Sequence, residues 1–328
     1  MHDEPEAATT VELPPWPEAR PPHLPDALTS LSPWVIGFLL LAGLQVFAGW
    51  RELVAEGDLR DGSTIAFIIQ ARLPGVCVAL LAAALFSRHP DAHRRLPMLT
   101  FGVVLLNVAA LMGLATNALN TVFVAAAEAG DEGSSVVTVG IYGGAIIVLV
   151  SFGVVFLARG LAMTRRGADV VSGRVLGIAM IALVAVGSVL SLIPFFSQPD
   201  TASLLSPFNV VFFVLAKLNN LAWAYLFVIA FGGWLAGEQP RIGWLLAALA
   251  AGLDVALLLL LGLAGLVDIA RAGQAVLEII GWLGVANWVL LLLAFAVGLP
   301  PVAMAVDDPE VSVTADSLEA TRSGSGAG

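Results

Sequence analysis

The chain has 328 residues, of which 59% are hydrophobic and only 12% are charged. Soluble domains carry about twice that charged fraction, and long apolar runs recur along the chain, so the composition excludes a soluble protein and predicts an all-α, polytopic transmembrane helix bundle. The net charge of −10 lies mostly in the two ends of the chain, so it does not favour a cationic substrate, and we expect no nucleic-acid partner.

The first segment, residues 1–32, holds six acidic residues and seven prolines. Such a composition cannot bury enough apolar surface to fold, and it predicts a disordered, Pro-rich cytoplasmic tail. The segment Pro22–Pro25 could dock a partner, but we favour a plain solvated tail. No basic n-region precedes the first apolar run, so we expect no cleaved signal peptide. Residues 305–328 hold five acidic residues and are also predicted to be disordered.

Residues 33–304 form the expected membrane domain. About eight apolar runs follow one another at 33–50, 64–86, 96–118, 136–157, 175–196, 207–234, 242–266 and 276–299. The second run is weak, because its apolar part, Leu73–Phe86, is too short to cross ~30 Å of hydrocarbon. Extending it back to Thr64 gives a full span but encloses Gln70, Arg72 and Pro74. We therefore expect eight spans, or seven if this run does not cross.

The distribution of arginine predicts the orientation. With the N-terminus inside, the inner segments hold ten arginines and the outer segments hold four. Cytoplasmic loops carry an excess of basic residues, so we expect both termini in the cytoplasm. Fourteen arginines against one lysine, with abundant Ala, Val, Leu and Gly, resemble coding in a high-GC bacterial genome. The expected location is therefore the cytoplasmic (inner) membrane of a bacterium.

Two ionisable residues lie deep in apolar runs: the only lysine, Lys217, and Asp254. A charge at such depth costs roughly 3 kcal/mol on insertion scales, so it usually has a partner or a function. Counted from the outer ends of their helices, Arg72, Lys217 and Asp254 lie about 12, 15 and 18 Å deep. We therefore hypothesise that Lys217 and Asp254 pair. The pair would act as a register lock between two spans, or as a proton or ion relay.

Three amides complete the intramembrane polar candidates: Asn220, which shares the helix face of Lys217, Asn107 and Asn287. Buried amides commonly form hydrogen bonds between helices, and we favour that role over coordination of a solute. Three Gly-xxx-Gly patterns begin at Gly140, Gly173 and Gly233, and they indicate close helix packing only weakly. The segments 101–106 and 152–157 resemble each other, which we attribute to coincidence.

The sequence contains no recognisable catalytic motif. It lacks a metalloprotease His-Glu-x-x-His, a nucleophile elbow, a Walker loop and a dinucleotide fingerprint. His89 and His93 lie in a cytoplasmic loop with Asp91, but we favour a positively charged loop over a metal site. No histidine lies in a span, which disfavours haem. We therefore expect no cofactor and no metal, and we expect that the protein is not an enzyme.

Two functions remain open. The first is permeation or transport of a solute or ion through the bundle, supported by Lys217, Asp254, Arg72 and the buried amides. The second is a non-enzymatic accessory or scaffold subunit of a membrane complex that docks through its Pro-rich tail. A lipid-modifying enzyme is a third class with no local support. Beyond the lipid bilayer, the partner would be another membrane protein or a second copy of the chain.

Overall fold

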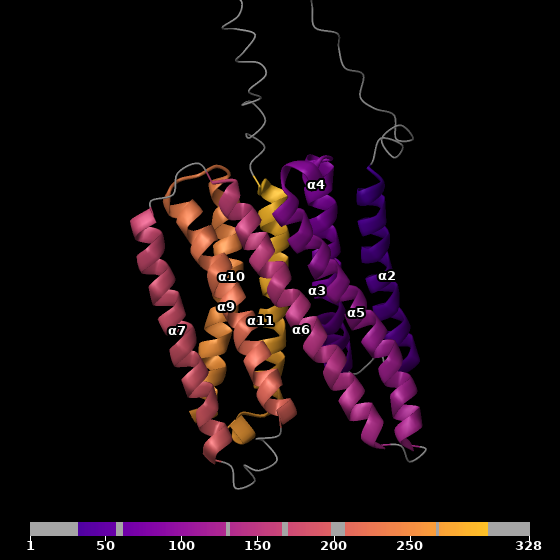
Figure 1. The fold of residues 1–328 in the computed structure, drawn as a ribbon. Helices are drawn as coiled ribbons and strands as arrows, with labels where there is room; N and C mark the ends of the chain where they lie inside the picture. Colours follow the sequence, from indigo (N-terminus) through magenta and orange to yellow (C-terminus); the bar gives the residue numbers. More distant parts are fainter. Residues whose placement is uncertain are drawn as a thin grey trace, which may run out of the picture. The chain divides into compact units, whose positions relative to one another are not determined.

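The computed structural model describes residues 32–56, 62–128, 132–165, 170–197, 207–266 and 269–300. Its described part is helical throughout, with eight long helices and one short one (Figure 1). They are α2 (Pro33–Glu56), α3 (Gly62–Arg88), α4 (Ala92–Arg95), α5 (Pro97–Glu128), α6 (Glu132–Met163), α7 (Val170–Ser197), α9 (Pro207–Leu235), α10 (Arg241–Leu266) and α11 (Ile269–Val297). The two predicted tails, residues 1–32 and 305–328, lie outside the described residues apart from Ser32.

Proline and glycine mark several helix ends. Pro33, Pro97 and Pro207 are each the first residue of a helix. An N–H at this position has no intrahelical partner, so its absence in proline costs no hydrogen bond. After α9 the chain turns through Gly237, whose φ is +70°. The N–H of Glu238 then donates to the carbonyl of Gly233 at 3.1 Å, which is the closing bond of a glycine C-cap. The connection from α9 to α10 is therefore short and tightly turned.

Six of the long helices have a described segment long and apolar enough to cross a membrane, in α2, α3, α5, α6, α9 and α10. Described apolar segments of α7 and α11 are shorter, at Arg174–Leu190 and Gly281–Val297. The prediction of an all-helical fold is confirmed for the described residues, and the six long apolar helices are compatible with the predicted multi-pass membrane protein. Each of the eight predicted runs falls within or close to one long helix, although the described residues do not fix the number of crossings at eight.

The doubtful second run forms one continuous helix. The apolar segment of α3 extends over Thr64–Arg88 and includes Pro74. Proline is tolerated inside membrane helices because neighbouring groups can satisfy the carbonyl that loses its partner. The structure therefore shows the longer form of the predicted run, from Thr64, as part of one helix.

Six helices form a closed ring of neighbours. In order around the ring, α3 contacts α5, α5 contacts α6, α6 contacts α9, α9 contacts α10, α10 contacts α11, and α11 returns to α3. α2 packs outside the ring against α3, and α7 packs outside it against α9 and α10 (Figure 1). The ring gives the bundle an interior toward which several helices can direct polar side chains.

The backbones of α5 and α6 approach each other closely. A Cβ on Gly102 would lie 2.6 Å from the backbone N of Leu157, and one on Gly160 would lie 2.6 Å from the backbone N of Leu99. Gly153 lies opposite Gly102, so the two similar segments 101–106 and 152–157 pack against each other. Of the glycines in the predicted patterns, Gly144 and Gly233 contact side chains, whereas Gly177 and Gly237 have nothing within 4 Å.

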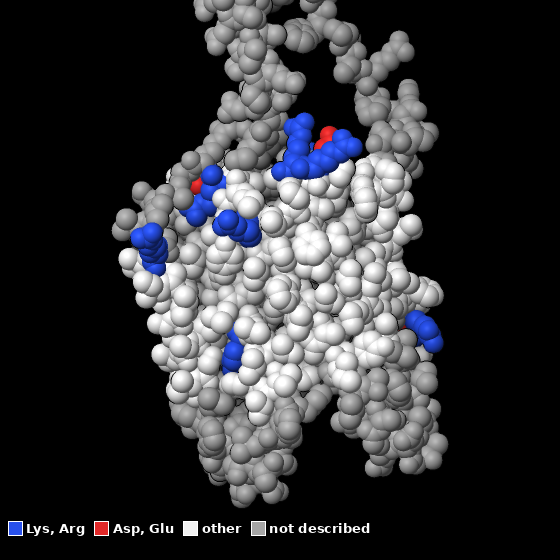
Figure 2. All heavy atoms as spheres, viewed as in Figure 1, with Lys and Arg blue, Asp and Glu red and all other residues white. Residues whose placement is uncertain are grey.

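Most described basic residues lie at one end of the bundle. Seven of the ten basic side chains that the structure describes are on α4 or at the α3, α6, α7 and α10 ends that lie beside it: Arg88, Arg94, Arg95, Arg159, Arg165, Arg174 and Arg241. Figure 2 shows this gathering of Lys and Arg at the end where α4 lies. We refer to it as the arginine-rich end.

Candidate functional site

A layer of polar side chains lies inside the bundle, away from the helix ends. Gln45, Asn107, Ser151, Asp254 and Asn287 each come from a different helix, and each lies at least ten residues from either end of its helix. Gln45, Asn107, Ser151 and Asn287 are all buried. Substrate sites in helical transporters are typically found at this depth, so we call this set the mid-bundle layer.

Three members of this layer make hydrogen bonds to backbone. The Nε2 of Gln45 donates to the carbonyl of Ala110 at 3.1 Å and so joins α2 to α5. The Nδ2 of Asn107 donates to the carbonyl of Val103 at 2.8 Å and to that of Val78, on α3, at 3.4 Å. The hydroxyl of Ser151 donates to the carbonyl of Ile147. The bond from Asn107 to Val78 joins α5 to α3, which is the role between helices predicted for the buried amides.

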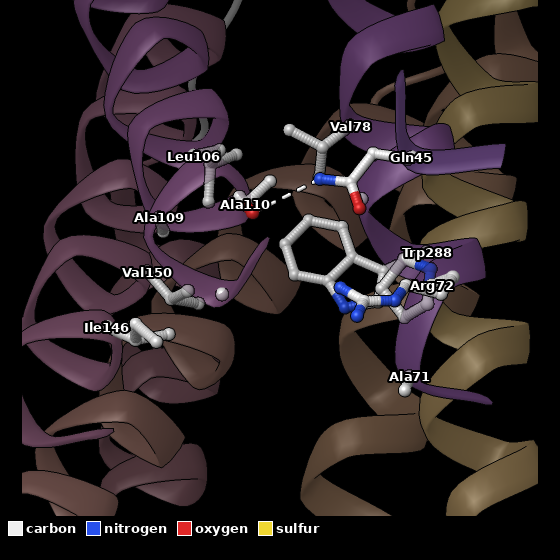
Figure 3. Close-up of a pocket in the computed structure, with 13 residues that line it drawn as sticks. Gln45, Ala71, Arg72, Val78, Leu106, Ala109, Ala110, Ile146, Val150 and Trp288 are labelled. Carbon is white, nitrogen blue, oxygen red and sulfur yellow. Dashed lines mark hydrogen bonds between the residues drawn. The ribbon is translucent and has the colours of Figure 1, made fainter. Parts of the chain in front are cut away.

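A cavity of about 280 Å³ opens beside this layer, between α2, α3, α5, α6 and α11. Its two walls differ in chemistry (Figure 3). Gln45, Arg72 and Trp288 lie together on one wall, whereas Leu106, Ala109, Ile146 and Val150 line the other. A cavity of this kind, mostly apolar with a few convergent polar groups, is typical of small-molecule sites, although its volume lies near their lower limit.

The positive charge of Arg72, on the cavity wall, is balanced by a carboxylate on α2. Arg72 is 6% exposed, and its Nε donates to Oε2 of Glu52 at 2.9 Å, while its Nη2 bonds to Oε1 of the same carboxylate. Glu52 lies near the end of α2, with its side chain 33% exposed. Arg72 therefore directs its guanidinium away from the middle of the bundle, toward a partly solvated partner, as long basic side chains in membranes commonly do.

The predicted pairing of Lys217 with Asp254 is wrong, because the two residues lie at different heights. A Cβ on Gly233 would lie 2.6 Å from Trp244, and one on Gly252 would lie 3.2 Å from Phe227. Counting along α9 and α10 from these two contacts puts Asp254 level with residues 223–225 of α9. Lys217 is six to eight residues nearer the start of α9, which is roughly 10 Å along the axis.

Lys217 also lies on a different side of α9 from the residues that meet Trp288 and α10. Trp223, Leu226, Ala230 and Gly233 form a buried stripe at helical spacing, which the half-buried Asn219 continues. Lys217, also half-buried, is about half a turn away from that stripe. The Nζ of Lys217 lies 4.6 Å from the centre of the Phe213 ring. Lys217 is therefore not part of the cavity wall.

Within the mid-bundle layer, Asp254 and Asn287 approach the same interface. Oδ2 of Asp254 and Oδ1 of Asn287 are both buried and have no hydrogen-bond partner. Oδ1 of Asn107, Oδ1 of Asn219 and Oγ1 of Thr100 are further oxygens of this kind among the described side chains. The predicted candidate on that helix was Asn220, whereas the amide on the buried stripe of α9 is its neighbour Asn219.

The predicted metal-site alternative finds no support among the described residues, which contain no cluster of three or more His, Cys, Asp or Glu side chains. His89 instead lies 3.4 Å from the carbonyl of Pro300. Burial lowers the pKa of His89 below its ordinary value, and the charges of Arg88 and Arg95 lower it further, although the bond to Pro300 acts in the opposite direction. Arg88 donates to the carbonyls of Phe295 and Ala296 at the end of α11.

The sequence prediction missed Gln45, Glu52 and Trp288. Gln45 is a single amide at the middle of the first apolar run, a position that could have drawn attention to it. Glu52 lies two residues beyond position 50, where the first predicted apolar run ends. Trp288 looks like any apolar residue of the last span, and only the packing shows that it lines the cavity and meets Trp223, with ring centres 5.2 Å apart.

No protein-family model matches this chain, and no curated protein or solved structure matches it either.

Proposed function

We propose that this integral membrane protein carries a small solute or ion through its helix bundle. The observation that supports this function is the cavity beside the mid-bundle layer, with Arg72, Gln45 and Trp288 on one wall. A buried charge is costly even when it is paired, so an arginine beside an open space favours a binding role over a purely structural one.

The chemistry of the cavity indicates the class of solute. The guanidinium of Arg72, the amide of Gln45 and the indole of Trp288 can all donate hydrogen bonds, and the opposite wall is aliphatic. A small molecule with hydrogen-bond acceptors at one end and an apolar body fits both walls. Its acceptors would share the Arg72 donors with Glu52.

The orientation we propose places the arginine-rich end in the cytoplasm. Basic residues accumulate in cytoplasmic loops, and the arginine-rich end gathers seven of the ten described basic side chains. With this orientation, the Arg72–Glu52 pair lies on the side of the mid-bundle layer that faces away from the cytoplasm. Both ends of the chain would then be cytoplasmic.

The experiment is a flux measurement on full-length protein in liposomes. Osmotic swelling is followed with urea, glycerol, alanine and sodium acetate, together with a protein-free control. Gly113 lines the cavity and has nothing within 4 Å of an added Cβ, so Gly113→Phe fills the space without a clash at its Cβ. Gly177 is equally open but lies on α7, outside the cavity, and Gly177→Phe is the matched control.

We expect at least one solute to enter faster than into protein-free liposomes, Gly113→Phe to lose this flux, and Gly177→Phe to keep it. Equal flux through both variants would contradict a route through the cavity. If no solute passes and a membrane protein co-purifies with the full chain in mild detergent, the accessory-subunit alternative is favoured instead.

A further inference from the structure

Asp254 and Asn287 lie on facing surfaces of α10 and α11. Gly243 marks the surface of α10 that packs on α11, because a Cβ there would lie 3.0 Å from the Leu299 side chain and 3.2 Å from the carbonyl of Ala294. Asp254 is eleven residues after Gly243, or about three helical turns, and so falls on the same face. Asn287 is seven residues before Ala294 and shares the face of α11 that meets Gly243.

The two side chains are also level with each other. α10 and α11 are antiparallel, and near one end Gly243 is opposite residues 294–299. Eleven residues along α10 leads to Asp254, and the same step back along α11 leads to residues 283–288, which include Asn287. Two acceptor oxygens without partners, Asp254 Oδ2 and Asn287 Oδ1, therefore belong to one interface at one height.

We infer that Asp254 and Asn287 form a proton-binding site, in which Asp254 is a neutral carboxylic acid that donates to Oδ1 of Asn287. A carboxylate and an amide oxygen are both acceptors, so they cannot satisfy each other without a hydrogen between them. One proton taken up from water converts Oδ2 to a hydroxyl and gives both oxygens a partner. Protonation also removes the cost of a charge in the membrane interior.

The surroundings of Asp254 contain no described cation that could take the place of the proton. At this height α9 contributes Tyr225, and the described basic residue on that helix, Lys217, is roughly 10 Å away along the axis. The facing part of α7 contributes Met180 and Val184, and its described basic residue, Arg174, lies near the arginine-rich end. On the described side chains of α11, the polar group at this height is Asn287.

A proton at this site would affect the cavity through the next residue. Trp288 follows Asn287, lines the cavity and packs against Trp223. When Asp254 loses its proton, the amide of Asn287 must rotate to present its NH₂ group to the carboxylate. That rotation acts on the segment of α11 that carries Trp288, so proton binding and solute binding would be coupled. This coupling rests on the proposed function.

The test is infrared spectroscopy of the full-length protein in lipid nanodiscs at neutral pH, in H₂O and D₂O. We expect a protonated-carboxyl band that shifts in D₂O, is absent in Asp254→Asn, and moves to higher frequency in Asn287→Ala, which removes the acceptor. Asp91→Asn, at an exposed loop acid, should leave the band unchanged.

An identical band in the wild-type protein and Asp254→Asn would overturn the proposal, as would a band whose frequency is unaffected by Asn287→Ala. Loss of the band on addition of sodium at constant pH would also overturn it, because it would show a metal cation between the two oxygens. If Asp254→Asn does not fold, Asn287→Ala still tests the hydrogen bond. The spectrum does not depend on flux, so failure of the proposed function and failure of the proton site are distinguishable.

Discussion

Replacing Gly160 with alanine should weaken the contact between α5 and α6. The added Cβ would lie 2.6 Å from the N, 2.7 Å from the Cα and 2.6 Å from the Cβ of Leu99. Two of these atoms belong to the backbone, so a change of rotamer cannot relieve the clash. The helices must separate by a few tenths of an ångström or more, and the neighbouring contact of Gly102 with Gly153 would be strained with them.

Two opposing effects set the size of the change. Overpacking a well-packed interface costs typically about 1–3 kcal/mol, and loss of close packing along the pair adds to that cost. Alanine is better than glycine in a helix interior by roughly 1 kcal/mol. Because backbone atoms are involved, we place the clash at the upper part of its range and expect a net loss of about 1–2 kcal/mol in the free energy of unfolding.

The assay is reversible unfolding in mixed detergent micelles, followed by circular dichroism. Gly177→Ala is the matched control, because Gly177 is also helical and nothing lies within 4 Å of an added Cβ; this variant should be unchanged or slightly more stable. Leu99→Ala combined with Gly160→Ala should not restore stability, since the backbone clash persists. Equal stability of Gly160→Ala and Gly177→Ala would refute the close approach of α5 and α6.

Three further outcomes are expected. Glu52→Ala should destabilise the protein by about 3–5 kcal/mol, because it leaves the buried guanidinium of Arg72 without its partner. Arg72→Ala should cost less, because it leaves only a partly solvated carboxylate. Chemical unfolding of both variants compares them. The ordinary pKa of histidine is 6.5, and the pKa of His89 in the folded protein is lower. As pH falls below 6.5, the unfolded chain therefore takes up a proton before the folded protein does, and the stability of the fold should decrease until the lowered pKa is reached. Thermal unfolding at about pH 7.5 and about pH 5.5 measures this decrease, which should be smaller in His89→Gln. Gln45→Leu removes the bond to Ala110 and should cost about 1 kcal/mol in the same unfolding assay, and an unchanged stability would show that this bond contributes nothing.

The helices could be predicted from the sequence because the length of an apolar run is a local property. The run at 207–234 became α9 over Pro207–Leu235, and that at 242–266 became α10 over Arg241–Leu266. The difficult second run also became a full helix, since the few polar groups within it find partners in the fold. Arg72, one of those groups, is buried and paired with Glu52, a partner that the sequence did not indicate.

Contacts between helices could not be predicted in the same way. The depths of Lys217 and Asp254 were counted from the ends of their spans, but α9 and α10 are offset along their axes. Glycine contacts such as Gly252 against Phe227 set this offset, and no local pattern encodes it. The similarity of segments 101–106 and 152–157 was visible in the sequence, but only the antiparallel packing of α5 on α6 gives it a physical meaning.

The bonds from Arg88 to the carbonyls of Phe295 and Ala296 have a consequence for biogenesis. They join residues more than 200 positions apart, at the place where α3 meets α11. Of the six ring helices, α3 is the first to emerge from the ribosome during synthesis and α11 is the last. The two neighbours of this contact are therefore separated in time by the synthesis of the other four, and the ring of these six helices cannot close until α11 is inserted.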